Sequence, residues 1–380
     1  MDFRIPEELE MVRQTARRFV NEEFRPIERE IDETDRVDPQ VMRRLRLRAA
    51  ELGIYAHNLP MSIGGGGLSA LGQVVIAEEL GKSTVTLCRT AGFLPSMLTD
   101  CHTHQRSWFL DPLVKGESVL AYAVTEPDGG SDIGSMKTKA VRKDGGWVIN
   151  GSKAFVSNVQ LADFIVVVAI TDPSAPLRGR FTLFIVERNH PGFHYLRAIK
   201  KMGWRGGDFS AFSLDDCFVD DGHVLGEVNQ GFNSIMKTIN STRIHLGGYY
   251  VGMAEELLSQ ACAYAKQRKT FGKRLADHQA IQFMIADSDM EMEAARLLTY
   301  RAAMAADEGH ADMRITASRA KCYAGEMTGR VADRVMQIFG AAGYTCDYTI
   351  ERMYRDSRAF RIGEGTSEMQ RMQIARNLLD

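Results

Sequence analysis

The hydrophobic pattern of this chain changes its period twice, and this change restricts the folds open to it. In Glu7–Val20, the apolar residues fall on one helical face. Phe164–Ile170 and Phe181–Glu187 are instead apolar, β-branched and aromatic runs of strand length. Helical spacing returns in the apolar stripes of Val251–Ala265 and Ile281–Leu298. The order of elements is therefore predicted to be α, then β, then α.

These changes predict three domains, with boundaries at residues 1–118, 119–222 and 223–380. Val74–Leu80 and Phe93–Leu98 add helical segments to the first domain. Asp144–Gly145 and Asn150–Gly151 suit tight hairpin turns in the second, because Gly and Asn tolerate positive φ. No long helical pattern separates the strands, which favours an antiparallel barrel or sandwich over a doubly wound sheet. The long amphipathic segments of the third domain fit an antiparallel helix bundle.

Composition excludes several classes of function. The 47 Lys and Arg residues against 49 Asp and Glu give a formal charge of −2, which argues against a nucleic-acid binder. There is no apolar run long enough for a membrane span and no leader pattern at the first residues. The six cysteines are scattered without a CxxC pair or a Cys/His cluster, so we expect no metal and a reducing, cytoplasmic setting.

A glycine-rich run at Ile63–Leu71 matches the G-x-G-x-x-A fingerprint of dinucleotide sites. That fingerprint must follow a strand and open a helix. The preceding His57–Ile63 contains Pro60 and polar residues, so we interpret the run as a loop.

Two motifs of the β region combine turns with polar groups. In Tyr122–Asp132, YAVTEPDGGSD, the amides around Gly130 and Ser131 suit phosphate or carbonyl oxygens, although a plain Asp-Gly turn explains the same letters. In Gly151–Asn158, GSKAFVSN, Phe155 and Ser157 share a strand face, where a flat cofactor could stack and accept a hydrogen bond. A phenylalanine that packs the core is the alternative.

The C-terminal region carries a candidate base. In Arg361–Gln370, RIGEGTSEMQ, Glu364 lies between two glycines, which let a backbone amide and a carboxylate face one substrate. Ser367 and Gln370 resemble a capping box, so a helix is expected just after the carboxylate. A glutamate held in such a loop could abstract a carbon-bound proton, whereas a solvated loop glutamate is the commoner case. Arg268–Gly272, RKTFG, and Gln337–Gly343, QIFGAAG, mark chain turns that suit either structure or binding.

Taken together and in this order, these motifs resemble the acyl-CoA dehydrogenases. The resemblance includes KMGWRG at Lys201–Gly206 and RKTFGK with HQAIQF within Arg268–Phe283, and it covers nearly the whole chain. It implies an α+β multidomain fold with an N-terminal helical domain, a middle antiparallel β-barrel and a C-terminal four-helix bundle. It also implies a homotetramer, FAD as cofactor, and an electron-transfer flavoprotein or similar acceptor as partner.

The resemblance implies a reaction as well. Glu364 matches the catalytic glutamate of the short- and medium-chain branch and is expected to take the α-proton of an acyl-CoA thioester while the β-hydrogen leaves as hydride to the flavin. The backbone amide of Glu364 is expected to polarise the thioester oxygen.

Further site residues follow from the matching positions. Those expected to bind FAD are Tyr122, Val124, Thr125, Gly130, Ser131, Phe155, Ser157, Arg268, Phe271, Gln279, Gln337, Gly340, Thr366 and Glu368. Of these, Arg268, Phe271, Gln279 and Gln337 are expected to reach the FAD of a neighbouring subunit. Those expected to contact the CoA portion or the thioester are Ser131, Asn240, Arg243 and Gly365.

The chain also departs from the family pattern. Gly363 replaces a tyrosine, which could widen the acyl pocket, and Phe155 replaces a tryptophan at the flavin. Relatives that place the base on the helix near Thr242 have a carboxylate there, and this chain has none. Arg89 is unusual on a helix that lines the acyl tail, and we hypothesise that it recognises a polar or anionic acyl terminus, unless it extends to solvent. An oxidase, a desulfinase, a reductase or a non-catalytic member remain alternatives.

Overall fold

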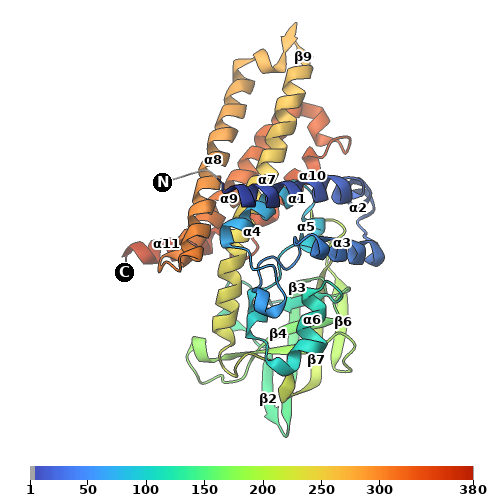
Figure 1. Ribbon diagram of the computed structural model, residues 1–380, viewed down its shortest axis with the longest axis vertical. Coiled ribbons are helices and arrows are strands. Elements are labelled where there is room, and N and C mark those ends of the chain that lie inside the picture. The colour runs from blue at the N-terminus through green and yellow to red at the C-terminus, as the bar shows by residue number, and fades with distance from the viewer. Residues whose placement is uncertain (1–4, 380) are drawn as a thin grey trace.

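The computed structural model describes residues 5–379. Along the chain, a sheet separates two helical regions; in space, the sheet lies at one end of the molecule beside the N-terminal helices, and the C-terminal helices extend to the other end (Figure 1). The N-terminal helices are α1 (Glu7–Phe19), α2 (Glu28–Thr34), α3 (Pro39–Glu51), α4 (Ala70–Leu80), α5 (Val85–Ala91) and α6 (Asp111–Val114). Side-chain oxygens of Asp38, Ser69 and Thr84 accept from backbone amides at the starts of α3, α4 and α5. The predicted order of α, β and α is confirmed.

The helix expected over Phe93–Leu98 is wrong in its first half. Only a short 3₁₀ turn forms, over Ser96–Asp100. Pro95 disfavours helical dihedrals in the residue before it and has no N–H to donate, so the chain stays extended up to that point. The glycine-rich run near Gly65 is a loop, as expected, because the residues before it form turns rather than a strand.

The middle region is one twisted sheet, mostly antiparallel. Its strands are β1 (Leu120–Ala123), β2 (Lys139–Lys143), β3 (Gly146–Ser157), β4 (Phe164–Ile170), β5 (Phe181–Glu187), β6 (Phe193–Ala198), β7 (Phe209–Asp220) and β8 (Val224–Leu225). They follow the order β6-β7-β3-β2-β4-β5-β8, and β1 pairs with β4 in parallel. Buried apolar side chains of β3, β4, β5 and β7 fill the interior of the curved sheet.

One of the two predicted hairpin turns is correct. Asp144–Gly145 joins β2 to β3. Asn150–Gly151 does not turn the chain, because it lies inside β3, where the pairing with β7 shifts register between Ile149 and Gly151. A Cβ on Gly151 would lie 2.5 Å from the Thr138 hydroxyl oxygen, so this bulge requires glycine for close approach to the next segment.

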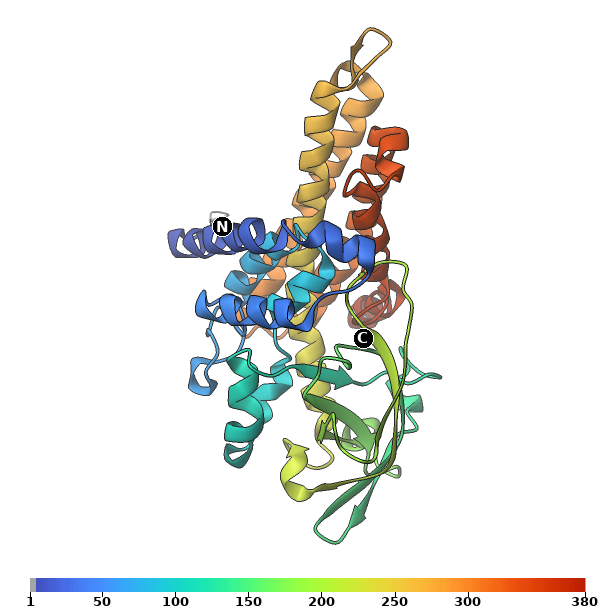
Figure 2. The same cartoon turned by 90° about the vertical axis from the view of Figure 1, so that its right-hand side faces the viewer.

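The C-terminal region is built on three long helices. Its helices are α7 (Gly231–Gln267), α8 (Gln279–Asp307), α9 (Met313–Phe339), α10 (Ile350–Ser357) and α11 (Ser367–Leu379). α7 and α8 run as a hairpin whose tip carries the short strands β9 (Lys269–Thr270) and β10 (Lys273–Arg274), far from the sheet in both views (Figures 1 and 2). Within residues 5–379, no helix combines the length and the apolarity needed to cross a membrane.

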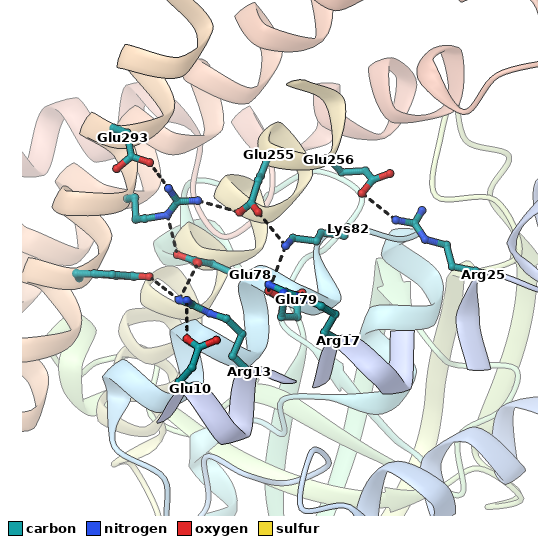
Figure 3. Close-up of polar contacts among 12 residues, drawn as sticks. Glu10, Arg13, Arg17, Arg25, Glu78, Glu79, Lys82, Glu255, Glu256 and Glu293 are labelled. Carbon is teal, nitrogen blue, oxygen red and sulfur yellow. Dashed lines mark hydrogen bonds and ion pairs between the residues drawn. The ribbon is translucent and has the colours of Figure 1, made fainter. Parts of the chain in front are cut away.

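A network of ion pairs joins the N-terminal helices to this bundle (Figure 3). The carboxylate of Glu79 on α4 accepts from Arg17 on α1 at 2.9 Å and from Lys82 at 3.1 Å. Lys82 also reaches Glu255 on α7 at 3.0 Å. Glu78 is as buried as Glu79 and faces Arg13 on α1 at 3.7 Å. These contacts hold α4 and the residues just after it against α1 and α7.

Candidate active site

A cavity of about 1590 Å³ opens where the two helical regions meet the sheet. Its wall includes Arg89 on α5, Tyr122 on β1, Phe155 on β3, Thr242 on α7 and Glu364 in the loop before α11. A site for one small ligand usually measures about 300–1,000 Å³, so this cavity has room for a cofactor and a substrate together.

Glu364 stands at the wall of this cavity in a strained turn. Its φ is 55° and that of Gly365 is 86°, so two successive residues adopt the left-handed conformation. Such strain in a non-glycine residue persists only where the surrounding structure enforces it, and it concentrates at functional sites. Within residues 5–379, the amide nitrogens of Glu364 and Gly365 donate to no acceptor of the protein, which leaves them available to a ligand. We call these two residues the 364–365 turn.

The carbonyls of the 364–365 turn are held by three buried side chains. Arg243 on α7 donates from Nε to the Glu364 carbonyl at 3.2 Å. Lys321 on α9 donates from Nζ to the Gly365 carbonyl at 2.7 Å. Gln370 on α11 donates from Nε2 to the same Gly365 carbonyl at 3.0 Å. Three helices therefore fix the backbone on which the carboxylate is mounted.

The helix expected after the carboxylate is present, but its cap differs from the prediction. The hydroxyl of Thr366 accepts from the Met369 amide at 3.3 Å, so Thr366 and not Ser367 caps α11. Ser367 is the first helical residue. Gln370 does reach back as a capping-box residue would, yet it reaches carbonyls rather than an amide.

The loop after β1 is fixed by a buried ion pair. Lys153 on β3 donates from Nζ to Glu126 Oε1 at 2.9 Å and to the Val124 carbonyl at 3.1 Å. Glu126 also accepts from the amides of Lys137 at 2.6 Å and Thr138 at 2.9 Å. Burial lowers the pKa of Lys153 to about 8 against the opposing attraction of Glu126. These bonds tie both ends of the Gly- and Ser-rich loop to the sheet.

The cavity end at α5 carries polar and aromatic groups. Arg89 lies over the Trp204 ring at 5.7 Å, and within residues 5–379 its guanidinium has neither a hydrogen bond nor an ion pair. Arg89 is exposed to the cavity yet surrounded by protein, and this surrounding lowers its pKa, whereas the carboxylate of Glu364 opposes that shift. His245 packs on Phe93 with ring centroids 4.8 Å apart, and burial lowers its pKa well below the ordinary value.

The cavity collects most of the predicted site residues. Those that line it are Arg89, Tyr122, Val124, Thr125, Gly130, Ser131, Phe155, Ser157, Arg243, Glu364, Gly365 and Thr366. Seven predicted residues do not line it, namely Asn240, Arg268, Phe271, Gln279, Gln337, Gly340 and Glu368. Asn240 instead accepts from Arg243 at 3.4 Å. Phe271 lies at the hairpin tip with 97% of its surface exposed.

The lining residues fit FAD on observations of this chain alone. Within the described residues, the amides of Gly130 and Ser131 donate to no protein acceptor, so they are free for phosphate or carbonyl oxygens. The hydroxyl of Tyr122 is buried beside the cavity without a partner. Phe155 has a φ of 58° and presents 54% of its surface, which leaves an apolar ring for a flat ligand. A flavin needs this combination of donors and stacking surface.

Sequence reasoning missed several residues of the site. Lys153 stands inside the GSKAFVSN motif, but it is buried beside Glu126, which lies in the loop after β1 and is 27 residues away in the sequence. Trp204 belongs to the KMGWRG motif, where nothing in the letters predicts its contact with Arg89. Lys321 sits in a helical segment of ordinary composition and carried no signal at all.

Comparisons with known proteins agree with this geometry. Three family models match in succession: acyl-CoA dehydrogenase N-terminal domain over residues 6–117, middle domain over 121–217 and C-terminal domain over 229–379. The short-chain specific acyl-CoA dehydrogenase of Clostridium acetobutylicum is 36% identical, and the alignment covers 99% of each chain. The caffeyl-CoA reductase–Etf complex subunit CarC of Acetobacterium woodii is 37% identical, with 98% of each chain covered.

A solved structure gives the same result. Butyryl-CoA dehydrogenase from Megasphaera elsdenii superposes with a TM-score of 0.93 at 33% identity, and the match covers 100% of both chains. The cavity, the turn that mounts Glu364 and these matches along the whole length lead to one conclusion. The chain belongs to the acyl-CoA dehydrogenase family, whose members are FAD-dependent oxidoreductases that act on CH–CH groups.

Proposed function

We propose that this protein oxidises an acyl-CoA thioester to the 2-enoyl-CoA, with Glu364 as the base that takes the α-proton. The observation that carries this proposal is the position of Glu364, the carboxylate mounted on the strained turn at the cavity wall. Thr242 on α7 also lines the cavity but has no carboxylate, so the base is assigned to Glu364 alone of these two positions.

The residues divide the work of the reaction. The 364–365 turn holds the Glu364 carboxylate toward the α-carbon, and its free amide is available to the thioester oxygen, where negative charge develops as the proton leaves. Ser131, Tyr122 and the amide of Gly130 would hold FAD against Phe155. FAD, when bound, supplies the acceptor for the hydride that leaves the β-carbon.

The direct test is reduction of the bound flavin. The purified holoenzyme is expected to be yellow, and its flavin absorbance is followed without oxygen while a panel of acyl-CoA thioesters is added. We expect bleaching with at least one saturated thioester and none with the free acid. If no saturated thioester bleaches the flavin, the flavin is reduced chemically and an enoyl-CoA is added. Return of the yellow absorbance would then assign the protein to the reductases. Rapid consumption of oxygen by the reduced holoenzyme would assign it to the oxidases.

A reductase is the second candidate because the relative CarC is named as a caffeyl-CoA reductase subunit in a complex with Etf. The same site serves both directions, since a base that removes the α-proton also returns it. The direction depends on the potential of the electron partner. We propose an electron-transfer flavoprotein as that partner, and a reduced-flavin oxidation assay with this partner present and absent checks it.

We further propose that copies of the chain assemble, with a tetramer as the expected state. The support is the hairpin tip at β9, which lies far from the sheet in Figure 1. Arg268 and the almost fully exposed Phe271 flank this strand, and neither lines the cavity of its own chain. A second copy could place this tip at the FAD of the first. Light scattering measures the number of copies in the assembly. Phe271→Ala is expected to lower FAD retention although it leaves the cavity residues of its own chain, including Glu364, unaltered.

Arg89 supports a proposal about the substrate. A cation that lines the acyl cavity with no protein partner is costly against a plain alkyl chain, and a carboxylate or sulfinate terminus would satisfy it. We expect Arg89→Met to lower kcat/KM for dicarboxyl-CoA thioesters far more than for alkyl ones, and Arg89→Lys to restore part of the loss. Equal effects on both classes would contradict this assignment.

A further inference from the structure

We infer that Lys321 is a positioning residue for the proton abstraction: its ammonium group, by holding the Gly365 carbonyl, keeps the Glu364 carboxylate aimed into the cavity. The inference rests on the proposed function of Glu364. It concerns a residue of α9 that reaches the site only through the backbone of the 364–365 turn.

The first argument is the isolation of this ammonium group. The side chain of Lys321 is fully buried. Within residues 5–379, its hydrogen bond to the Gly365 carbonyl, at 2.7 Å, is the one bond that Nζ makes, and no carboxylate lies within ion-pair distance. An unpaired buried charge is costly, and an apolar side chain of similar volume would be favoured if packing were the sole purpose.

The second argument is that the neighbouring helices add donors to the same backbone. Arg243 holds the Glu364 carbonyl and is itself only 3% exposed, again without a carboxylate in contact. Gln370 holds the Gly365 carbonyl from the third side. A Cβ on Gly365 would lie 2.8 Å from Gln370 Nε2 and 3.0 Å from the Arg243 guanidinium, so this turn fits against the donors only because it has glycine.

The third argument is geometric. Glu364 and Gly365 both adopt left-handed conformations, their two carbonyls accept from the three donors, and within residues 5–379 their two amides donate to no acceptor. Release of one carbonyl would let the turn relax toward ordinary dihedrals and would rotate the carboxylate. A displacement of about 1 Å at a reacting group can lower a rate by about 10²-fold.

The charged groups around Lys321 also support a link between this residue and Glu364. Burial and the nearby Arg243 lower the pKa of Lys321 to about 8, and the carboxylates of Glu364 and Glu368 oppose the shift. The thiol of Cys322, on the same helix, also opposes the lowering of this pKa. The attraction of Glu364 therefore favours the charged form of Lys321, although the two side chains make no direct contact.

The test compares Lys321→Met, Lys321→Arg and the surface control Lys266→Met in the FAD-loaded protein. For Lys321→Met we expect a fall in kcat of about 10²-fold, KM within threefold of the wild type, and full FAD content. Lys321→Arg keeps a hydrogen-bond donor at this position, and its kcat is expected to be at least tenfold higher than that of Lys321→Met. Hydrogen–deuterium exchange is expected to rise at the amides of residues 362–366 in Lys321→Met and to stay unchanged in Lys266→Met.

Some results would overturn the inference. A kcat within threefold of the wild type in Lys321→Met, or a loss of FAD and of melting temperature that Lys321→Arg does not restore, would leave Lys321 without a positioning role. If Lys321→Met does not fold, Gln370→Leu removes the second donor to the same carbonyl and must lower kcat in the same way. If the wild type itself reduces no flavin, the proposed function fails, while the exchange measurement still tests the hold on the turn.

Discussion

The ammonium group of Lys153 lies 2.9 Å from the Glu126 carboxylate in the interior of the protein, and both side chains are buried. The pair spans from β3 to the loop that follows β1, and the same ammonium group also holds the Val124 carbonyl. It therefore connects the strand that carries Phe155 to the loop that carries Gly130 and Ser131. The Lys153–Glu126 ion pair therefore links the two parts of the cavity wall that are expected to hold the flavin.

Removal of one partner of this pair tests its role. Lys153→Met leaves the Glu126 carboxylate buried without its cation, and we expect the free energy of unfolding to fall by about 3–5 kcal/mol. The FAD content after gel filtration is expected to fall as well. In Lys153→Met with Glu126→Gln, part of the stability should return while FAD retention stays low. Full FAD content and unchanged urea unfolding in the single variant would contradict this account.

The open wall at Gly363 predicts a change of substrate range. A Cβ at this position meets nothing closer than the Ala359 carbonyl at 3.8 Å, so a side chain fits there without strain. Gly363→Tyr is expected to fill the cavity beside Glu364 and to lower kcat/KM for branched or aryl thioesters by about tenfold or more relative to short straight ones. Gly363→Ala serves as the control with little effect. An equal loss for all thioesters would show that the ring blocks the site instead.

Glu78 predicts a pH dependence of stability. Burial raises its pKa to about 7, and the attraction of Arg296 and Arg13, at 3.6 and 3.7 Å, offsets this shift only in part. The unfolded chain releases this proton near pH 4.3, so between about pH 4.3 and 7 the folded state holds more protons and loses stability as pH rises. Removal of the carboxylate should remove this loss.

We compare the free energy of unfolding of Glu78→Gln with that of the wild type. We expect this difference to be about 2 kcal/mol more favourable to the variant at pH 8 than at pH 5. Urea unfolding at the two pH values measures this difference. Glu117→Gln, at an exposed position, should show no such difference. If this difference is the same at pH 5 and at pH 8, Glu78 is already ionised in the folded protein at pH 5, which contradicts the prediction.

The sequence was most informative where one residue pattern has one structural solution. The period of the apolar residues predicted the order of helices and strands, and Phe164–Ile170 and Phe181–Glu187 form β4 and β5 with the expected ends. Glu364 is predicted as the base because glycines flank it in a motif that resembles that of the family, and the structure places it at the cavity wall. The Asn150–Gly151 pair was misjudged because the dipeptide that suits a tight turn also suits a bulge, and only the neighbouring Thr138 decides between them.

The supports of the site could not be predicted from the sequence. The bond from Lys321 to the Gly365 carbonyl joins residues 44 positions apart, and the ion pair of Lys153 with Glu126 joins residues 27 apart. A lysine in a helix or a strand is ordinarily exposed, so the letters alone favour a solvated side chain. The packing of three helices and a sheet around one cavity determines which of these lysines are buried.

The central claim is that the Glu364 carboxylate removes the α-proton. Its most direct measurement is the rate of anaerobic flavin bleaching by the best thioester in Glu364→Gln, with Glu117→Gln as the matched control. We predict that Glu364→Gln retains FAD and binds the thioester with similar affinity, while the rate of bleaching falls by about 10⁴-fold, because the amide keeps the shape of the carboxylate but cannot accept the proton. A bleaching rate within tenfold of the wild type would contradict the account.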